Sequence, residues 1–143
     1  MQTLRSATVA PNAMVATPHH LATSAGLDTL RAGGSAMDAA IAANAVLTVL
    51  YPDQTSIGGD CFFIAWDAGA EEATAFNGSG AAPQLADPDE LRAEGYAAMP
   101  RRGPRTVLVP GTIDAWVEGH RRFGRLPFDQ QIVPLGADPD VKE

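Results

Sequence analysis

The sequence predicts an α+β fold in which helices pack on an antiparallel sheet. Two segments with the residue spacing of helices, 18–32 and 36–51, precede two β-rich segments, 61–67 and 73–79, that a short turn separates. A further helical pattern follows at 111–125. Two adjacent strands joined by a turn form a hairpin, which is stable only when other elements cover its apolar surface.

Length and composition are those of one globular domain. The chain has 143 residues, of which 45% are apolar and 19% charged, whereas disordered chains contain fewer apolar residues. A net charge of -7, without a sustained basic or aromatic stripe, argues against a nucleic-acid partner. No apolar stretch has the length of a membrane span, and the single cysteine excludes an internal disulfide. We therefore expect a cytoplasmic protein without a membrane partner.

Basic residues are concentrated in the second half of the chain. Seven of the ten lie between positions 92 and 125: Arg92, Arg101, Arg102, Arg105, Arg121, Arg122 and Arg125. Such a cluster could bind an anion. The interspersed Glu and Asp residues favour a solvated face of paired charges instead.

The first helix is expected at 18–32. Thr17 is predicted as its N-cap, and Pro18 as its first residue, where a missing N–H costs nothing. Gly33 and Gly34 are predicted to end the helix, because a left-handed C-terminal cap excludes most residues with a Cβ atom.

The second helix is expected at 36–51. Ser35 and Asp38 have the spacing of a capping box, in which each side chain binds the backbone N–H of the other residue. The segment is apolar or small on nearly every side, which predicts a buried helix. Asn44 is the polar exception, and a hydrogen-bonded structural amide is favoured over a ligand contact.

The strand CFFIAWD, 61–67, and the segment ATAFNGS, 73–79, are predicted to pair as a hairpin. CFFIAW has almost no polar alternation, so the strand is expected to be covered on both faces. Gly58 and Gly59 precede it and are expected to allow a sharp turn. Asp60 is expected to hold this turn by local hydrogen bonds rather than to act as an acid or base.

Weaker signals predict the remaining segments. Residues 1–12 are expected to form a flexible arm, and 14–17 and 106–110 short strands. A helical turn is expected at 87–95. The helix at 111–125 is predicted to place five residues on one face, namely Ile113, Trp116, Val117, His120 and Phe123.

The chain contains no self-contained catalytic site that its residues alone identify. The Gly-Gly-Asp loop lacks the glycine spacing and the lysine of a phosphate-binding loop. Cys61 leads into an apolar strand, which favours a small buried hydrophobe over a nucleophile. His19 and His20 are adjacent and cannot share a helix face as metal ligands, and His120 is expected to pack in the core. No Gly-x-Ser-x-Gly turn anchors a serine triad.

Three ordered motifs carry a resemblance to a known family. They are Gly-Gly-x-Ala-x-Asp-Ala-Ala at 33–40, the glycine pair before the strand, and Val-Pro-Gly-Thr at 109–112, which leads into a helix with a tryptophan. Over residues 13–128 the chain resembles the N-terminal part of the γ-glutamyltranspeptidase family of Ntn hydrolases. Residues 129–143 do not match.

The resemblance implies part of a four-layer αββα sandwich made as a precursor that cleaves itself. The new N-terminal threonine of the second piece would be the nucleophile, and its α-amino group the base. A glutamyl-type amide would be attacked, and water or an amino acid would accept the acyl group. The resemblance implies no cofactor and no metal.

The resemblance also places a substrate-binding segment directly after the hairpin. The family carries an arginine for the substrate α-carboxylate in a pattern that aligns with residues 77–83, and Ser79 stands at the arginine position. Ser79, Asn77 and Gly80 are therefore the expected substrate-binding residues. Because a bidentate charged contact is lost, the sequence favours relatives such as oxamate-type amidohydrolases over a true glutathione transpeptidase.

No residue of these 143 is predicted to be catalytic, since nothing resembles the family's nucleophilic threonine segment. The expected partner is a C-terminal subunit that carries this threonine, together with a small amide substrate, and the sequence leaves a homo-oligomer open. The alternative is a truncated, non-catalytic homologue that acts as a binding or structural module. Trimming that would turn Thr3 into an N-terminal nucleophile has little support.

Overall fold

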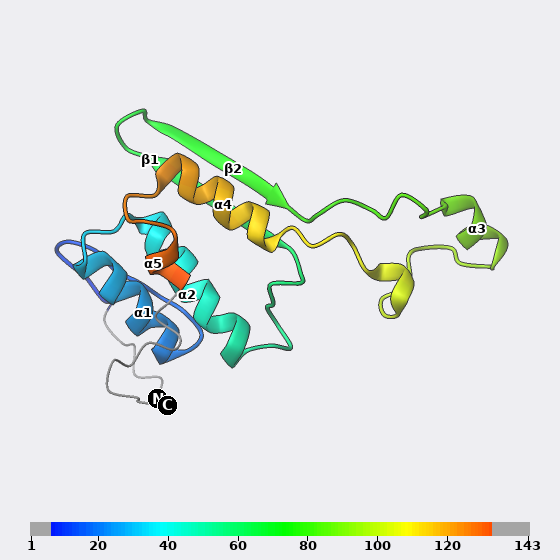
Figure 1. Ribbon diagram of the computed structural model, residues 1–143, viewed down its shortest axis with the longest axis horizontal. Helices are drawn as coiled ribbons and strands as arrows, with labels where there is room; N and C mark the ends of the chain where they lie inside the picture. Colours follow the sequence, from blue (N-terminus) through cyan, green and yellow to red (C-terminus); the bar gives the residue numbers. More distant parts are fainter. Residues whose placement is uncertain (1–6, 133–143) are drawn as a thin grey trace.

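Five α-helices, one 3-10 turn and a two-stranded sheet make up the part of the chain that the computed structural model describes, residues 7–132 (Figure 1). The elements in chain order are α1 (His20–Arg31), α2 (Ala36–Leu50), β1 (Cys61–Asp67), β2 (Glu72–Gly78), α3 (Pro88–Ala93), the 3-10 turn η1 (Pro104–Thr106), α4 (Thr112–Phe123) and α5 (Asp129–Ile132). None of the described helices is long and apolar enough to span a membrane.

The turn between α1 and α2 follows the sequence prediction. Gly33 adopts a left-handed φ of 93°, and the N–H of Gly34 donates to the Thr29 carbonyl at 3.0 Å, as in a glycine C-cap. The Ser35 hydroxyl accepts from the Asp38 N–H at 3.1 Å, and the Asp38 carboxylate accepts from the Ser35 N–H at 2.8 Å. The predicted capping box is confirmed, and it starts α2.

The start of α1 differs from the prediction. The helix begins at His20, and its N-cap is His19, whose Nδ1 accepts from the Leu21 N–H at 3.2 Å. Thr17 is not the cap, because its hydroxyl donates to the His19 carbonyl at 2.7 Å. The extended backbone of His19 brings the imidazole to the orphan N–H group of the first turn.

Helix α2 is the centre of the core, although it is not buried on every side. Ala43 and Val46 pack with Ala22 of α1. Ile41 and Ala45 pack with Trp116 of α4. The prediction of an all-round buried helix is wrong, because Ala36, Ala40 and Val49 are exposed.

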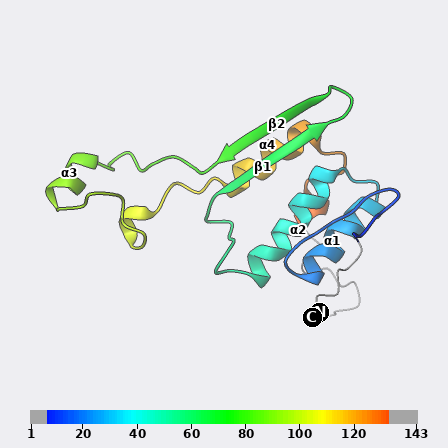
Figure 2. The same cartoon turned by 180° about the vertical axis from the view of Figure 1, so that it is seen from behind.

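The predicted hairpin is confirmed. β1 and β2 are antiparallel, with a register that runs from Cys61 opposite Gly78 to Asp67 opposite Glu72. However, exposure alternates along β1, and Phe62, Ile64 and Trp66 are 59%, 81% and 65% exposed. The prediction that both faces are covered is wrong, because within residues 7–132 the helices lie against one face only (Figure 2).

Helix α4 lies between α2 and the hairpin (Figure 1). Its buried residues are Thr112, Ala115, Trp116 and Gly119. Trp116 and Phe123 point inward as predicted, but Ile113 and Val117 are exposed. The buried face of α4 differs from the predicted one because small residues on this helix allow close packing against α2. A Cβ atom at Gly119 would lie only 2.9 Å from the Met37 sulfur.

Two predicted strands are wrong, and the predicted helical turn is confirmed as α3. Residues 14–17 and 107–110 are outside helices and strands in the described chain. A strand needs a neighbour with which to exchange hydrogen bonds, and the second segment makes a single such bond, from Val109 N–H to the Ala81 carbonyl at 2.9 Å. Of the predicted N-terminal arm, residues 1–6 lie outside the described residues; 7–12 are exposed and irregular.

Between β2 and α4 the chain leaves the body as a projecting arm, which we define as residues 81–109 (Figures 1 and 2). The arm carries α3 and η1, neither of which has a buried residue. Arg105 pairs with Glu90 at 3.6 Å and also with Glu94, so these contacts are internal to the arm.

Asp38 joins the start of α2 to the segment after α4. Its carboxylate accepts from the backbone N–H groups of Arg125 and Leu126 at 2.9 and 3.2 Å, and from the Gln131 amide at 2.7 Å. Burial alone would raise the pKa of Asp38, but hydrogen bonds from the backbone N–H groups of Ser35, Arg125 and Leu126 hold that pKa below its usual value. The buried acid is therefore ionised and satisfied.

Candidate functional site

A shallow cavity of about 280 Å³, the Ser79 cavity, lies where the loop before β1 meets the end of β2 and the base of the arm. It is lined by residues 58–60, by Ser79, and by Thr106–Leu108 and Pro110. The structure brings this loop and Ser79 to one hollow.

Backbone hydrogen bonds fix the loop to the start of α4. The Gly59 carbonyl accepts from the N–H groups of Gly111 and Thr112 at 3.0 and 3.2 Å. The buried Thr112 hydroxyl donates to the Ser56 carbonyl at 3.1 Å. Two orphan N–H groups at the N-terminus of α4 are thereby satisfied, and one wall of the cavity is held in place.

Three glycines let the end of β2 cross the segment that precedes α4, beneath the cavity. A Cβ atom at Gly78 would lie 2.6 Å from the Cys61 carbonyl oxygen and 2.9 Å from Ala115 Cβ. A Cβ atom at Gly111 would collide with the Gly78 carbonyl, and one at Gly80, where φ is 80°, would collide with the Val109 carbonyl. No side chain larger than hydrogen fits at these positions without movement.

The expected turn at Gly58 and Gly59 is present, and the Gly59 N–H donates to the Ser56 carbonyl at 3.3 Å, but the turn does not require glycine as strictly as the crossing does. Gly58 and Gly59 do not adopt a left-handed φ, and a Cβ atom at Gly58 would meet nothing closer than 4.0 Å. The signal for the crossing was present in the sequence, since Gly78 ends β2, Gly80 follows two residues later and Gly111 is the N-cap of α4. It was missed because the crossing joins segments that are about thirty residues apart.

Of the three predicted substrate-binding residues, one lines the cavity. Ser79 is half-buried, and its N–H donates to the Asn77 side-chain oxygen at 3.0 Å. Asn77 is exposed on the hairpin and orients Ser79 through this bond. Gly80 is part of the backbone crossing. Their roles toward a substrate stay predictions.

Among the described residues that line the cavity, Asp60 is the only ionisable one, and none is an arginine. Within residues 7–132 no hydrogen bond holds the Asp60 carboxylate, so the expected turn-holding role is not what the structure shows. The bonds to Gly111 and Thr112 hold the loop instead. Arg105, the arginine nearest along the chain, pairs with Glu90 and Glu94 in the arm.

Cys61 does not have the environment of a nucleophile. Burial, and then the negative charge of Asp60, raises the pKa of its thiol. The side chain packs against the cluster of Ile41, Ala45 and Trp116. The interpretation of Cys61 as a small packed residue is therefore supported, since a reactive cysteine needs a stabilised thiolate.

The histidines and Asn44 serve the fold. His120 Nε2 is 2.7 Å from the Leu126 carbonyl, and its ring packs against Phe128. Asn44 accepts from the Trp116 indole N–H at 2.9 Å, which confirms the structural amide. His19 caps α1 and stacks on His20.

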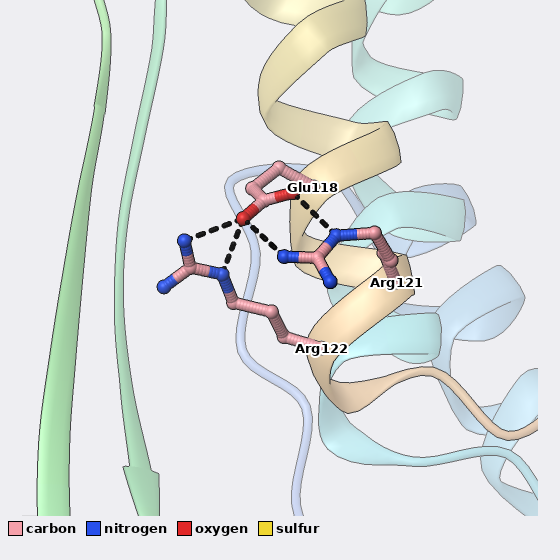
Figure 3. Close-up of polar contacts among 3 residues, drawn as sticks. All are labelled: Glu118, Arg121 and Arg122. Atoms are coloured by element: carbon pink, nitrogen blue, oxygen red, sulfur yellow. Dashed lines mark hydrogen bonds and ion pairs between the residues drawn. The ribbon is translucent and has the colours of Figure 1, made fainter.

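Part of the basic cluster lies on α4, where two arginines form ion pairs with a glutamate (Figure 3). Glu118 accepts from Arg121 Nε at 2.8 Å and from Arg122 Nε at 2.5 Å. Hydrogen bonds from Arg121 and then Arg122 lower the pKa of Glu118 to about 2. On this face both arginines pair with Glu118 of the same helix, as the interspersed charges predicted.

The fold class is the one that the sequence motifs led us to expect, and comparison with known proteins establishes the family. The sequence model of the gamma-glutamyltranspeptidase family matches residues 22–136. The chain belongs to this family, and the resemblance drawn from the three motifs is confirmed.

Particular relatives refine this assignment. The glutathione hydrolase-like YwrD proenzyme of Bacillus subtilis is 37% identical over 122 residues, which are 85% of this chain and 23% of that protein. The oxamate amidohydrolase proenzyme of Klebsiella pneumoniae is 39% identical over 119 residues, 82% of this chain and 22% of that protein. The chain thus spans less than a quarter of the length of these relatives.

The structure of gamma-glutamyltranspeptidase from Pseudomonas nitroreducens superimposes with a TM-score of 0.77 and 27% identity, over 88% of this chain and 38% of that chain. This similarity confirms the predicted fold class, helices packed on an antiparallel sheet as in the Ntn hydrolases of this family. A larger share of that solved chain has no counterpart in these 143 residues.

Proposed function

We propose that this chain is the N-terminal portion of a γ-glutamyltranspeptidase-like amidohydrolase that acts on a small amide or γ-glutamyl substrate. The nucleophilic threonine would lie on a segment outside these 143 residues, as in a processed proenzyme. We also propose that the enzyme is cytoplasmic, because a chain with a single cysteine forms no internal disulfide and suits a reducing compartment. The observation that carries the proposal is the Ser79 cavity, which the family's motif residues line.

The chain's part in the reaction would be to shape the pocket. The threonine hydroxyl would attack the amide carbonyl, and the threonine α-amino group would take the hydroxyl proton and pass it to the leaving amine. The resulting ester would then be cleaved by water or by an amino acid. Ser79 and the fixed backbone of residues 58–60 would form one wall against which the acyl group lies.

The electrostatics of the cavity favour an amide other than glutathione. A substrate α-carboxylate would meet Asp60 and no arginine among the described lining residues. Removing one partner of a buried charged pair typically costs about 2 to 5 kcal/mol. Oxamate also carries a carboxylate, but this group is bonded directly to the amide carbonyl carbon and would not occupy the position of a γ-glutamyl α-carboxylate. The similarity to an oxamate amidohydrolase supports this subgroup.

The proposal is tested on the protein produced from its complete reading frame. Intact mass under denaturing conditions should show a second species whose N-terminal residue is threonine, and the preparation should hydrolyse oxamate faster than γ-glutamyl amides. A single species with no amide hydrolysis would contradict the proposal and would favour the non-catalytic homologue.

Ser79→Arg tests the role of the cavity. The substitution restores the positive charge at the family's arginine position, so kcat/KM for γ-glutamyl amides relative to oxamate should rise by about tenfold or more. Ser79→Ala is the matched control and should leave this ratio unchanged. An unchanged ratio in Ser79→Arg would mean that residue 79 does not face the substrate.

A further inference from the structure

The Ser79 cavity carries a single formal charge, that of Asp60. The ion pairs within residues 7–132 all lie elsewhere, on α1, on α4 and in the arm. Because no hydrogen bond among these residues holds the Asp60 carboxylate either, the cavity presents an unpaired negative charge. Such a charge attracts a cationic ligand and repels an anionic one.

The acidic character continues into a neighbouring hollow of about 170 Å³. This hollow shares Gly59 and Asp60 with the Ser79 cavity and is otherwise lined by residues 52–56. Its second acid is Asp53, whose carboxylate accepts from the Gln54 side-chain amide at 3.0 Å. None of the described residues that line either hollow is basic. The potential around Asp60 is therefore negative on both sides, which favours a cationic ligand.

The hydrogen-bonding groups of the cavity favour the same kind of ligand. The Ser79 N–H already donates to the Asn77 side chain at 3.0 Å, and the Thr106 hydroxyl donates to the Gly103 carbonyl at 2.8 Å. Within residues 7–132 the Ser79 hydroxyl makes no hydrogen bond, so its oxygen is available as an acceptor. A protonated amine has N–H donors and no acceptor, and it therefore matches the cavity in charge and in hydrogen bonding.

We propose that Asp60, together with Ser79, selects amides whose acyl chain ends in an ammonium group. The inference rests on the proposed function and deepens it, since it names the substrate class of the same cavity. A γ-glutamyl amide carries an ammonium group but also an α-carboxylate, which Asp60 repels. Its counterpart without that carboxylate should be the better substrate. Oxamate does not test this pairing, because its only charged group is bonded to the reacting carbonyl carbon.

Other roles for Asp60 fit the structure less well. In the proposed mechanism the threonine α-amino group already supplies the general base. A metal ion needs more ligands than two acids provide, and no group of three or more His, Cys, Asp or Glu side chains within residues 7–132 is arranged to hold one. A solvated surface acid without a ligand is the remaining alternative. It predicts that the reaction does not depend on the charge of the substrate.

Amides of one chain length that differ only in their terminal charge test the proposal on the protein from the complete reading frame. The acyl chain ends in an ammonium group in 4-aminobutyramide, in a methyl group in pentanamide and in a carboxylate in glutaramate. The kcat/KM should fall in this order. It should differ by about tenfold or more between the two charged amides, because Asp60 attracts one and repels the other.

Asp60→Asn keeps the shape of the side chain and removes its charge. The substitution should lower the ratio of kcat/KM for 4-aminobutyramide to that for glutaramate about fivefold or more, and Asp60→Ser should do the same. Asp53→Asn is the matched control, because Asp53 lines only the neighbouring hollow. It should leave the ratio within about twofold of the wild type, since water and salt screen the more distant charge. A wild-type ratio near one, or equal ratios in the wild type and Asp60→Asn, would overturn the proposal.

This proposal and the proposed function fail separately. Hydrolysis of oxamate without a charge preference among the three longer amides would overturn the role of Asp60 and leave the amidohydrolase standing. If the protein hydrolyses no amide, the proposed function fails, and isothermal titration calorimetry with 4-aminobutyramide then tests the cavity alone. Binding that Asp60→Asn weakens about fivefold or more, and that Asp53→Asn does not weaken, would uphold the site. Equal binding to the wild type and Asp60→Asn, or no binding to either, would overturn it.

Discussion

At the scale of single residues, Asp38 joins two parts of the chain that are far apart in sequence. Local spacing identified its capping-box bond to Ser35, but three further donors come from Arg125, Leu126 and Gln131. These donors lie almost ninety residues away in the sequence, and Asp38 has no exposed surface. One carboxylate thus fixes both the start of α2 and the return of the chain after α4.

Asp38→Asn should destabilise the chain by about 2 kcal/mol, because the amide NH₂ group would face backbone N–H donors in a buried site. Asp28→Asn, at an exposed ion pair with Arg31, should change the free energy of unfolding by less than about 0.5 kcal/mol. Urea unfolding followed by circular dichroism measures both. Equal effects would show that the buried bonds of Asp38 do not matter to stability.

The lowered pKa of Asp38 also predicts a pH dependence. Because the folded pKa lies below the unfolded value of about 3.9, the carboxylate contributes stability that is fully present above that pH and is lost as pH falls through the folded pKa. The wild type should therefore lose more stability than Asp38→Asn between about pH 4 and pH 2. Parallel pH profiles for the two proteins would contradict the assignment.

At the scale of elements, the junction of β2, the arm and α4 depends on glycines. The close approach of Gly78 to Cys61 and Ala115 sets the distance between the hairpin and α4. Because this junction also carries Ser79 and the loop at 58–60, the shape of the candidate site is tied to the packing of a helix on a sheet. A change in that packing would therefore move the cavity wall.

Gly78→Ala should destabilise the chain by about 2 kcal/mol, since an added methyl group would overlap backbone and side-chain atoms in a packed site. Gly58→Ala has open space around its new Cβ atom and should stay within about 0.5 kcal/mol of the wild type. Thermal unfolding of the two variants measures both changes in stability. A larger loss of stability in Gly58→Ala than in Gly78→Ala would show that the turn at residues 58–60 requires glycine more strictly than the crossing at Gly78 does.

At the scale of the whole molecule, most features that neighbouring residues decide were predicted from the sequence, with the N-cap of α1 as an exception, whereas most predictions that depend on distant segments were wrong. The glycine turn at 33–34, the capping box and the hairpin all depend on contacts within a few residues, and all were correct. The wrong predictions concern features that depend on which element lies opposite. They are the burial of Ile64, the strand at 106–110 and the choice of residues on the inward face of α4. For the candidate site, the motifs indicated Ser79 and the glycine loop at 58–60. No local pattern indicated the backbone crossing beneath them, because the crossing joins segments that are about thirty residues apart.

The body and the arm should also differ in their resistance to proteolysis. Arg101 and Arg102 are exposed in an irregular stretch of the arm, whereas Arg31 ends a packed helix. Proteases need a segment that can open locally, and an arm without buried residues opens at little cost. Among the sites within residues 7–132, trypsin should therefore cut first after Arg101 or Arg102. Mass spectrometry of early fragments measures this order, and Arg101→Gln with Arg102→Gln should delay the first cut. Initial cleavage at Arg31 would mean that the helical body opens more readily than the arm, and the division into body and arm would then be wrong.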